Sequence, residues 1–171
     1  MNTSAKNSPL NIHVHIRTMD SFDLDQILEI DNLSFTSPWP KNAYLYELNE
    51  NPKSKLWVAE INLDTLEPRV IGMMVIWIIL DEIHIATLAV HPEHRKQGVA
   101  KQLIATALDE AKNLSAKEIT LEVRKSNIAA QELYRLFDFQ IVGLRKGYYQ
   151  NNREDALIMT RNNINAQPVH P

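Results

Sequence analysis

The chain has 171 residues, of which 44% are hydrophobic and 23% charged, and its net charge is −3. These values are ordinary for one soluble globular domain, and the slightly acidic balance argues against a surface that binds nucleic acid directly. The sequence contains no cysteine, which excludes disulfides, thiolate metal sites and a cysteine nucleophile and fits a reducing cytoplasm.

The two ends of the chain are polar and lack hydrophobic periodicity. We therefore predict a disordered N-terminal extension at residues 1–11, one domain at 12–161 and a flexible C-terminal tail at 162–171. The N-terminal stretch has no apolar segment of the kind found in signal peptides. The longest apolar run, residues 70–80, is about half as long as a membrane span and predicts a buried strand, so we expect no membrane partner.

The elements of the domain follow from hydrophobic periodicity and from helix caps. The first helix has an apolar stripe that runs from Phe22 to Leu33 and a cap at Asp20 or Ser21. In chain order the sequence predicts a strand at 13–17, helices at 21–33 and 41–49, strands at 55–61, 70–80 and 83–90, a helix at 98–114, a strand at 118–124, a helix at 128–137, and strand-like segments at 139–142, 147–149 and 154–160.

This order of elements predicts an α/β (α+β) fold with one mixed, mostly antiparallel sheet of about seven strands and about four flanking helices. The early strands can pair as an antiparallel meander. The helix at 98–114 should then act as a right-handed crossover, which would make the fourth and fifth strands parallel neighbours.

The loop between the fourth strand and this crossover helix, Arg95 to Lys101, is a candidate anion site. The first amides of a helix have no partners within the helix, and its dipole favours an anion at that end. Lys96 and Lys101 add positive charge on either side of Gly98. The loop matches neither a Walker A pattern nor a dinucleotide fingerprint. A glycine that only relieves backbone strain explains the same residues, so both interpretations stay open.

Three polar residues further along are candidates for chemistry. Glu122 lies on the polar face of a strand whose other face is apolar, where it is either an exposed strand residue or a general base whose pKa burial has raised. Asn127 and Tyr134 are two helical turns apart and share a face of the helix at 128–137. Tyr134 is either a packing residue or a phenol placed to donate a proton.

The histidines do not predict a metal site. His91 and His94 are close in sequence, but they have no evident third ligand nearby, so we expect no bound metal. Ser126 has no evident triad partners, which disfavours nucleophilic catalysis.

Two runs of residues resemble the GCN5-related N-acetyltransferase (GNAT) superfamily. The first is Leu88-Ala89-Val90-His91-Pro92 with Arg95-Lys96-Gln97-Gly98-Val99-Ala100. The second is Leu121-Glu122-Val123-Arg124-Lys125-Ser126-Asn127 with Leu133-Tyr134 and the later segments Arg145-Lys146-Gly147-Tyr148-Tyr149 and Glu154-Asp155-Ala156-Leu157-Ile158-Met159. This second run resembles the RimI branch, which acetylates the N-terminal alanine of ribosomal protein S18.

The resemblance implies that acetyl-CoA is the co-substrate. The backbone of Leu88, Ala89 and Val90 would hold its acetyl-pantetheine arm where the fourth and fifth strands splay apart, and Asn127 would hydrogen-bond that arm. The coenzyme A pyrophosphate would bind at the loop between the fourth strand and the crossover helix. That loop comprises Arg95, Lys96, Gln97, Gly98, Val99, Ala100 and Lys101.

The resemblance also implies direct acetyl transfer to a protein N-terminal amine, with Glu122 as general base and Tyr134 as the acid that protonates the thiolate. Trp39, Tyr148 and Tyr149 are candidates for the peptide groove, although edge packing explains them equally well. Asp138 stands where the family commonly has glycine, and aspartate tolerates the left-handed conformation that this turn needs. The alternatives are transfer to a lysine side chain, polyamine or small molecule, and a non-catalytic acyl-CoA-binding module.

Overall fold

A computed structural model describes residues 13–62 and 68–164 of the chain. The extension predicted at 1–11 lies outside the described residues, as does the predicted tail from residue 165 onward. The last strand ends at Asn162, and Ile164 beyond it is buried against the core. The packed domain therefore continues past the predicted boundary at residue 161.

The described residues form one mixed sheet of seven strands in the order β1-β2-β3-β4-β5-β7-β6. All neighbouring pairs are antiparallel except β4 and β5, which are parallel as predicted. The strands are β1 (Val14–Thr18), β2 (Ser54–Ile61), β3 (Arg69–Ile79), β4 (Glu82–Val90), β5 (Glu118–Arg124), β6 (Gln140–Tyr149) and β7 (Glu154–Asn162).

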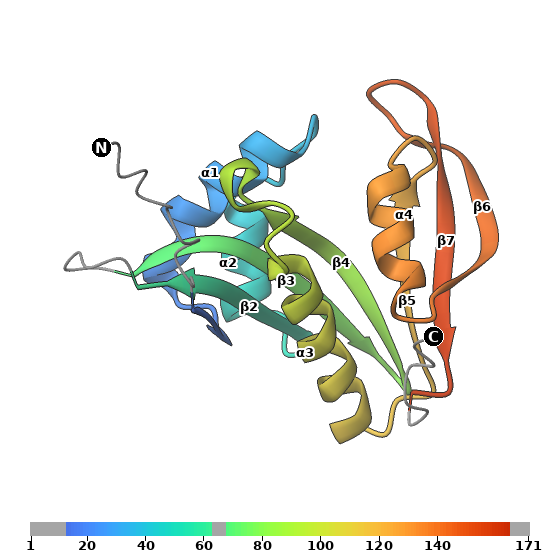
Figure 1. Ribbon diagram of the computed structural model, residues 1–171, viewed down its shortest axis with the longest axis horizontal. Helices are drawn as coiled ribbons and strands as arrows, with labels where there is room; N and C mark the ends of the chain where they lie inside the picture. Colours follow the sequence, from blue (N-terminus) through green and yellow to red (C-terminus); the bar gives the residue numbers. More distant parts are fainter. Residues whose placement is uncertain (1–12, 63–67, 165–171) are drawn as a thin grey trace, which may run out of the picture.

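Helices cover the sheet on both faces (Figure 1). One buried cluster contains residues of α3, α4 and the strands beneath them, and a second contains residues of α1, α2 and β2–β4. No helix among the described residues is long and apolar enough to cross a membrane. The helices are α1 (Leu24–Ser34), α2 (Lys41–Asn49), α3 (Val99–Asn113) and α4 (Ile128–Arg135), and short 3-10 turns occupy Ser21–Asp23 and Pro92–His94.

The parallel pairing of β4 with β5 is short. It extends only from Glu82–Glu118 to Ile85–Leu121. The next residue of β4, Ala86, is a bulge, because β3 pairs with the residues on either side of it. Beyond this point the two strands diverge, so that β1–β4 and β5–β7 form the arms of a V in Figure 1. The sheet therefore opens at its centre, next to the N-terminus of α3.

The sequence prediction was wrong in a few places, each for a local reason. Phe22 is 92% exposed, because it lies in a 3-10 turn that Asp20 caps and the helix starts only at Leu24. Leu33 is within the helix but is 52% exposed, so it is not part of the buried stripe. The two strand-like segments at 139–142 and 147–149 form one strand, β6, whose pairing with β7 has register shifts. The helix α4 ends at Arg135, two residues before its predicted end.

Gly72 on β3 allows α3 to pack closely against the sheet. A Cβ at this position would lie 3.0 Å from Val99 Cγ1, 3.3 Å from the Ala89 carbonyl oxygen and 3.4 Å from Leu103 Cδ1. Val99 and Leu103 are fully buried in the first turns of α3. This contact fixes the start of α3 against the part of β4 that has separated from β5.

We predict that Gly72→Ala lowers the free energy of unfolding by about 1–3 kcal/mol, because the added methyl group overpacks a backbone contact. Chemical denaturation followed by circular dichroism measures the change. Gly143→Ala is the matched control, because its Cβ would meet mainly the flexible end of Ile158 at the sheet edge. Equal stability of the two variants would contradict this account of α3 packing.

Candidate active site

Glu122 is the first residue of β5 beyond its pairing with β4. Its side chain is only 8% exposed, although it lies on the face of β5 opposite the buried Leu121 and Val123. Oε2 lies 3.1 Å from His84 Nε2, and Oε1 lies 3.0 Å from an Arg145 guanidinium nitrogen. The interpretation of Glu122 as an exposed strand residue is therefore wrong.

The contacts of Glu122 determine its protonation state. The hydrogen bond from His84 lowers the pKa of Glu122 below its ordinary value, and the charge of Arg145 acts in the same direction. Burial alone would raise this pKa, but the hydrogen bond outweighs it. The direction is opposite to the raised pKa that we considered for a general base. Glu122 is therefore ionised at neutral pH.

A stack of aromatic rings connects the α1–α2 loop to His84. The Trp77 ring lies between Trp39, at a centroid distance of 6.2 Å, and His84, at 5.6 Å, and both pairs are nearly parallel. Trp77 Nε1 donates a hydrogen bond to Glu47 Oε2 at 2.9 Å. The Trp39 amide donates to the buried Asp31 carboxylate at 2.6 Å. These bonds hold Trp39, at the end of the stack away from His84, and Trp77, in its middle.

The loop between β4 and α3 has the strained backbone expected of a tight turn. Lys96 and Gly98 have φ angles of 60° and 84°, in the left-handed region, and Gly98 is the N-cap of α3. No described atom would touch a Cβ on Gly98. The glycine is thus required by its backbone conformation, which would cost another residue about 1–2 kcal/mol, and not by a close neighbour.

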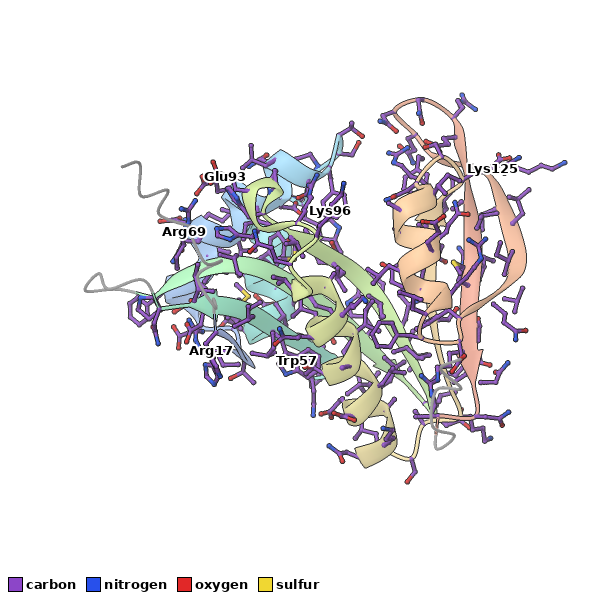
Figure 2. All side chains as sticks on the ribbon, in the orientation of Figure 1. Arg17, Trp57, Arg69, Glu93, Lys96 and Lys125 are labelled. Carbon is purple, nitrogen blue, oxygen red and sulfur yellow. The ribbon has the colours of Figure 1, made fainter. Side chains whose placement is uncertain are left out.

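Arg95 also anchors this loop. Its Nε donates to the Val90 carbonyl at 3.1 Å and its Nη2 donates to Ser34 Oγ at 3.1 Å, which joins the loop to the end of β4 and to α1. Lys96 lies on the side of the loop nearer to α4 in Figure 2, whereas Glu93 and Arg69 lie together on the other side. Lys96 therefore lies on the side of the loop that faces the opening between the strands.

His91 and His94 have a third potential ligand that the sequence analysis missed. Glu93 lies between them, and the ligand atoms of the three side chains lie within 4.8 Å of one another. Arg69 competes for the Glu93 carboxylate, at 3.8 Å. The 3-10 turn at Pro92–His94 brings the three side chains together, and the spacing of the two histidines alone did not show this.

The helix α4 begins at the C-terminal end of β5. Asn127 is its N-cap, and its Oδ1 accepts a hydrogen bond from the Ala130 amide at 3.1 Å. Tyr134 is 8% exposed, and burial raises its pKa to about 12. The buried Gln131 donates to the carbonyls of Arg124 and Lys125, at 3.2 and 2.9 Å, which ties α4 to the strand that carries Glu122. Asp138 has a φ of 62°, as predicted for this turn.

The α1–α2 loop and the β6–β7 turn contact each other across the opening. Thr36 Oγ1 accepts hydrogen bonds from Asn151 Nδ2 at 2.8 Å and from Arg124 Nη2 at 3.3 Å. The Arg124 guanidinium lies 3.7 Å from the Tyr149 ring centroid, and Arg145 lies 5.5 Å from the Tyr148 ring. The predicted groove residues Trp39, Tyr148 and Tyr149 thus come from two elements that meet on the same side of the sheet.

Glu154 at the start of β7 holds the turn between β5 and α4. Oε1 accepts the Ser126 amide at 2.8 Å, and Oε2 accepts Arg124 Nη1 at 2.9 Å. The hydrogen bonds with Ser126, together with the bond from Arg124, lower the pKa of Glu154 to about 2. This carboxylate therefore fixes the residues that immediately follow Glu122 on the chain.

Sequence reasoning missed several of these residues. Glu122 is contacted from other strands by His84 and Arg145, and Trp77 stacks on His84. The positions of these residues in the sequence carry no signal of those contacts. The one local signal was at His84, the polar residue between Ile83 and Ile85 on an apolar strand. Such alternation shows which face a side chain occupies but not what lies opposite it.

The profile of the acetyltransferase (GNAT) family matches residues 24–139. A Bacillus subtilis protein provisionally named as a ribosomal protein bS18-alanine N-acetyltransferase is 41% identical over 144 residues, which cover 84% of this chain and 92% of the relative. A Haemophilus ducreyi protein named as a ribosomal protein bS18-alanine N-acetyltransferase is 32% identical over 148 residues, which cover 84% and 97%.

A solved structure shares the fold. The crystal structure of the ribosomal-protein-S18-alanine N-acetyltransferase from Escherichia coli superposes with a TM-score of 0.77 at 24% identity. The superposition covers 93% of this chain and 99% of that chain. At that coverage the superposition extends over both arms of the sheet, so the two chains share one fold.

The Glu154 contacts predict a dependence of stability on pH. The pKa of Glu154 is about 2 in the folded chain, whereas it is about 4.3 in an unfolded one. The stability that this group contributes is therefore fully present above about pH 4.5 and is lost as the pH falls through 2. Glu154→Gln should be less stable than the wild type at pH 5, and the difference should shrink towards pH 2.

Urea denaturation of both proteins between pH 2 and 6 measures this difference. Glu50→Gln serves as a control, because Glu50 lies at the exposed end of α2 and should not change the pH dependence. A gap between wild type and Glu154→Gln that stays constant with pH would show that the carboxylate does not hold the turn through its charge.

Proposed function

The chain is an N-acetyltransferase that belongs to the acetyltransferase (GNAT) family, and from that premise we propose that it acetylates the N-terminal alanine of ribosomal protein S18 in the cytoplasm, using acetyl-CoA. The single observation that carries the proposal is the opening of the sheet past Ile85 and Leu121, with a buried carboxylate at its apex and a helix N-terminus beside it. The names of the two relatives support the choice of S18 as substrate.

The residues around the opening fit acetyl-CoA. In the described chain β4 pairs only with β3 beyond Ile85, so the other edge of Leu88, Ala89 and Val90 has no strand partner and can meet the amides of a pantetheine arm, apart from the Val90 carbonyl that Arg95 occupies. The first-turn amides of α3, from Val99 to Lys101, suit the pyrophosphate, with charge supplied by Lys96 and Lys101. Asn127 uses its Oδ1 as a helix cap, which leaves its amide nitrogen to contact the arm.

The proposed chemistry is direct transfer in a ternary complex. The amine nitrogen bonds to the thioester carbonyl carbon, a backbone N–H near Val90 stabilises the developing negative charge on oxygen, and the carbon–sulfur bond breaks. Tyr134 gives its phenol proton to the departing thiolate, and its raised pKa keeps that proton in place until then. Glu122, an ionised carboxylate at the apex of the opening, takes part in removing the proton of the amine.

The α1–α2 loop and the β6–β7 turn are joined on the acceptor side, which favours a chain terminus as the acceptor. Thr36 of the α1–α2 loop accepts hydrogen bonds from Asn151 of the β6–β7 turn and from Arg124 of β5, whose guanidinium lies over the Tyr149 ring. A peptide terminus that approaches beside this joined pair reaches Glu122 with little bulk. A lysine within a chain has backbone on both sides, and this backbone would have to approach the site together with the side chain.

We predict that Glu122→Gln and Tyr134→Phe each lower kcat by about 10²–10⁴-fold, because each removes a proton-transfer group. Both should leave the affinity for acetyl-CoA nearly unchanged, because neither residue is among those proposed to bind the cofactor. Steady-state kinetics with an alanine-terminated peptide, together with calorimetric titration of acetyl-CoA, measure the two effects. Wild-type kcat in both variants would remove this mechanism.

The substrate proposal predicts that S18 loses its N-terminal acetyl group in cells that lack this protein. Mass spectrometry of protein N-termini, compared between cells with and without the gene, measures the loss. A plasmid copy of the wild type should restore the acetyl group, whereas a Glu122→Gln copy should not. Unchanged acetylation of S18 in the deleted strain would remove S18 as the substrate and leave the acetyltransferase activity standing.

A further inference from the structure

We infer that His84 is a further catalytic residue, which accepts the proton that the acceptor amine gives up, while Glu122 holds the ring and stabilises its charge. The inference rests on the proposed transfer to an amine and changes the assignment of the proton acceptor within it. His84 lies on β4 in register with Thr120 of β5, inside the last stretch of paired strand before the opening. Its side chain is 18% exposed, against 8% for Glu122, so it is the more accessible of the two.

The hydrogen bond between the two side chains determines which ring nitrogen is free. An ionised carboxylate has only lone pairs, so His84 Nε2, at 3.1 Å from Glu122 Oε2, must carry the hydrogen of this bond. In the neutral ring the lone pair is then on Nδ1. Glu122 thus fixes the tautomer that can accept a proton, and its negative charge stabilises the imidazolium that results.

The surroundings hold the ring in one orientation. Trp77 stacks on His84 at an interplanar angle of 16°, and Glu47 of α2 in turn holds Trp77 through its indole nitrogen. Glu122 is itself held by Arg145 from β6 at 3.0 Å. The charged and titratable groups on the neighbouring elements are therefore Glu122 on β5, Arg145 and Tyr149 on β6, and Glu47 on α2.

Chemistry also favours the imidazole over the carboxylate as the proton acceptor. A base is most effective when its pKa lies near the operating pH, and an imidazole ordinarily titrates at about 6.5. Glu122 has its two oxygens occupied by His84 and Arg145, and both contacts favour its ionised form and make it a weaker base. A carboxylate held in this way is suited to orienting a histidine.

The proton balance of the step is complete. The neutral amine bonds to the carbonyl carbon and then loses one proton to His84 Nδ1, directly or through one water, which gives an imidazolium. The carbon–sulfur bond breaks and the thiolate takes the proton of Tyr134. The imidazolium proton then returns through solvent to the Tyr134 phenolate, so both side chains end in their starting states.

The kinetic test is the variant His84→Gln, whose amide can still donate a hydrogen bond to Glu122 but cannot titrate. We expect kcat with an alanine-terminated peptide to fall by about 10²-fold or more, and the acid limb of the kcat profile, which reports groups in the enzyme–substrate complex, to disappear. The matched control is His15→Gln. His15 also pairs with a glutamate, Glu60, at 3.2 Å, but lies on β1 far from the opening in sheet order. It should retain the wild-type rate and profile.

A second measurement does not depend on turnover. The nitrogen chemical shifts of the His84 ring in NMR should show the hydrogen on Nε2 in the wild type and should change in Glu122→Gln, because the carboxylate that accepts this hydrogen is lost. Wild-type rate and pH profile in His84→Gln, or unchanged nitrogen shifts of the His84 ring in Glu122→Gln, would overturn the inference. If the wild type acetylates no amine, the proposed function fails, and the NMR shift still tests the pairing by itself.

Discussion

The parallel pairing of β4 with β5 ends after Ile85 and Leu121, and the remainder of the site depends on that ending. Two strands that diverge within a sheet leave backbone groups without strand partners, which is unfavourable unless something else binds them. The bulge at Ala86 lies where the divergence starts, and the helices α3 and α4 contribute to one buried cluster with the strands beneath them. An opening built in this way can accept an extended chain of amides between its edges.

The polar side chains at the apex are held by contacts from several strands. Glu122 on β5 is bonded from β4 and β6, and Glu154 on β7 fixes the turn that follows it. Partial burial would favour the neutral form of such a carboxylate, yet the hydrogen bond from His84 outweighs that effect. The result is a negative charge in a confined place, which orients a neighbouring ring more effectively than it could in open water.

The sequence was sufficient for most of the fold and for part of the site. The alternation in β5 and the long amphipathic helix α3 predicted their own conformations, and the crossover predicted the parallel pair. The splay itself came from the family resemblance, because strand periodicity does not show where pairing stops. His84 and Arg145 could not be predicted as partners of Glu122, since their contacts are set by strand order and register across the sheet.

The central claim is that the amine and the acetyl group meet at this opening. A crystal structure with coenzyme A joined covalently to the N-terminal nitrogen of an alanine peptide tests it most directly. The account predicts that the linking carbon lies between β4 and β5 just past Ile85 and Leu121, with the peptide nitrogen about 2.6–3.2 Å from His84 or from one water bound to it. A linkage bound outside the opening, with the pyrophosphate away from the first turn of α3, would contradict it.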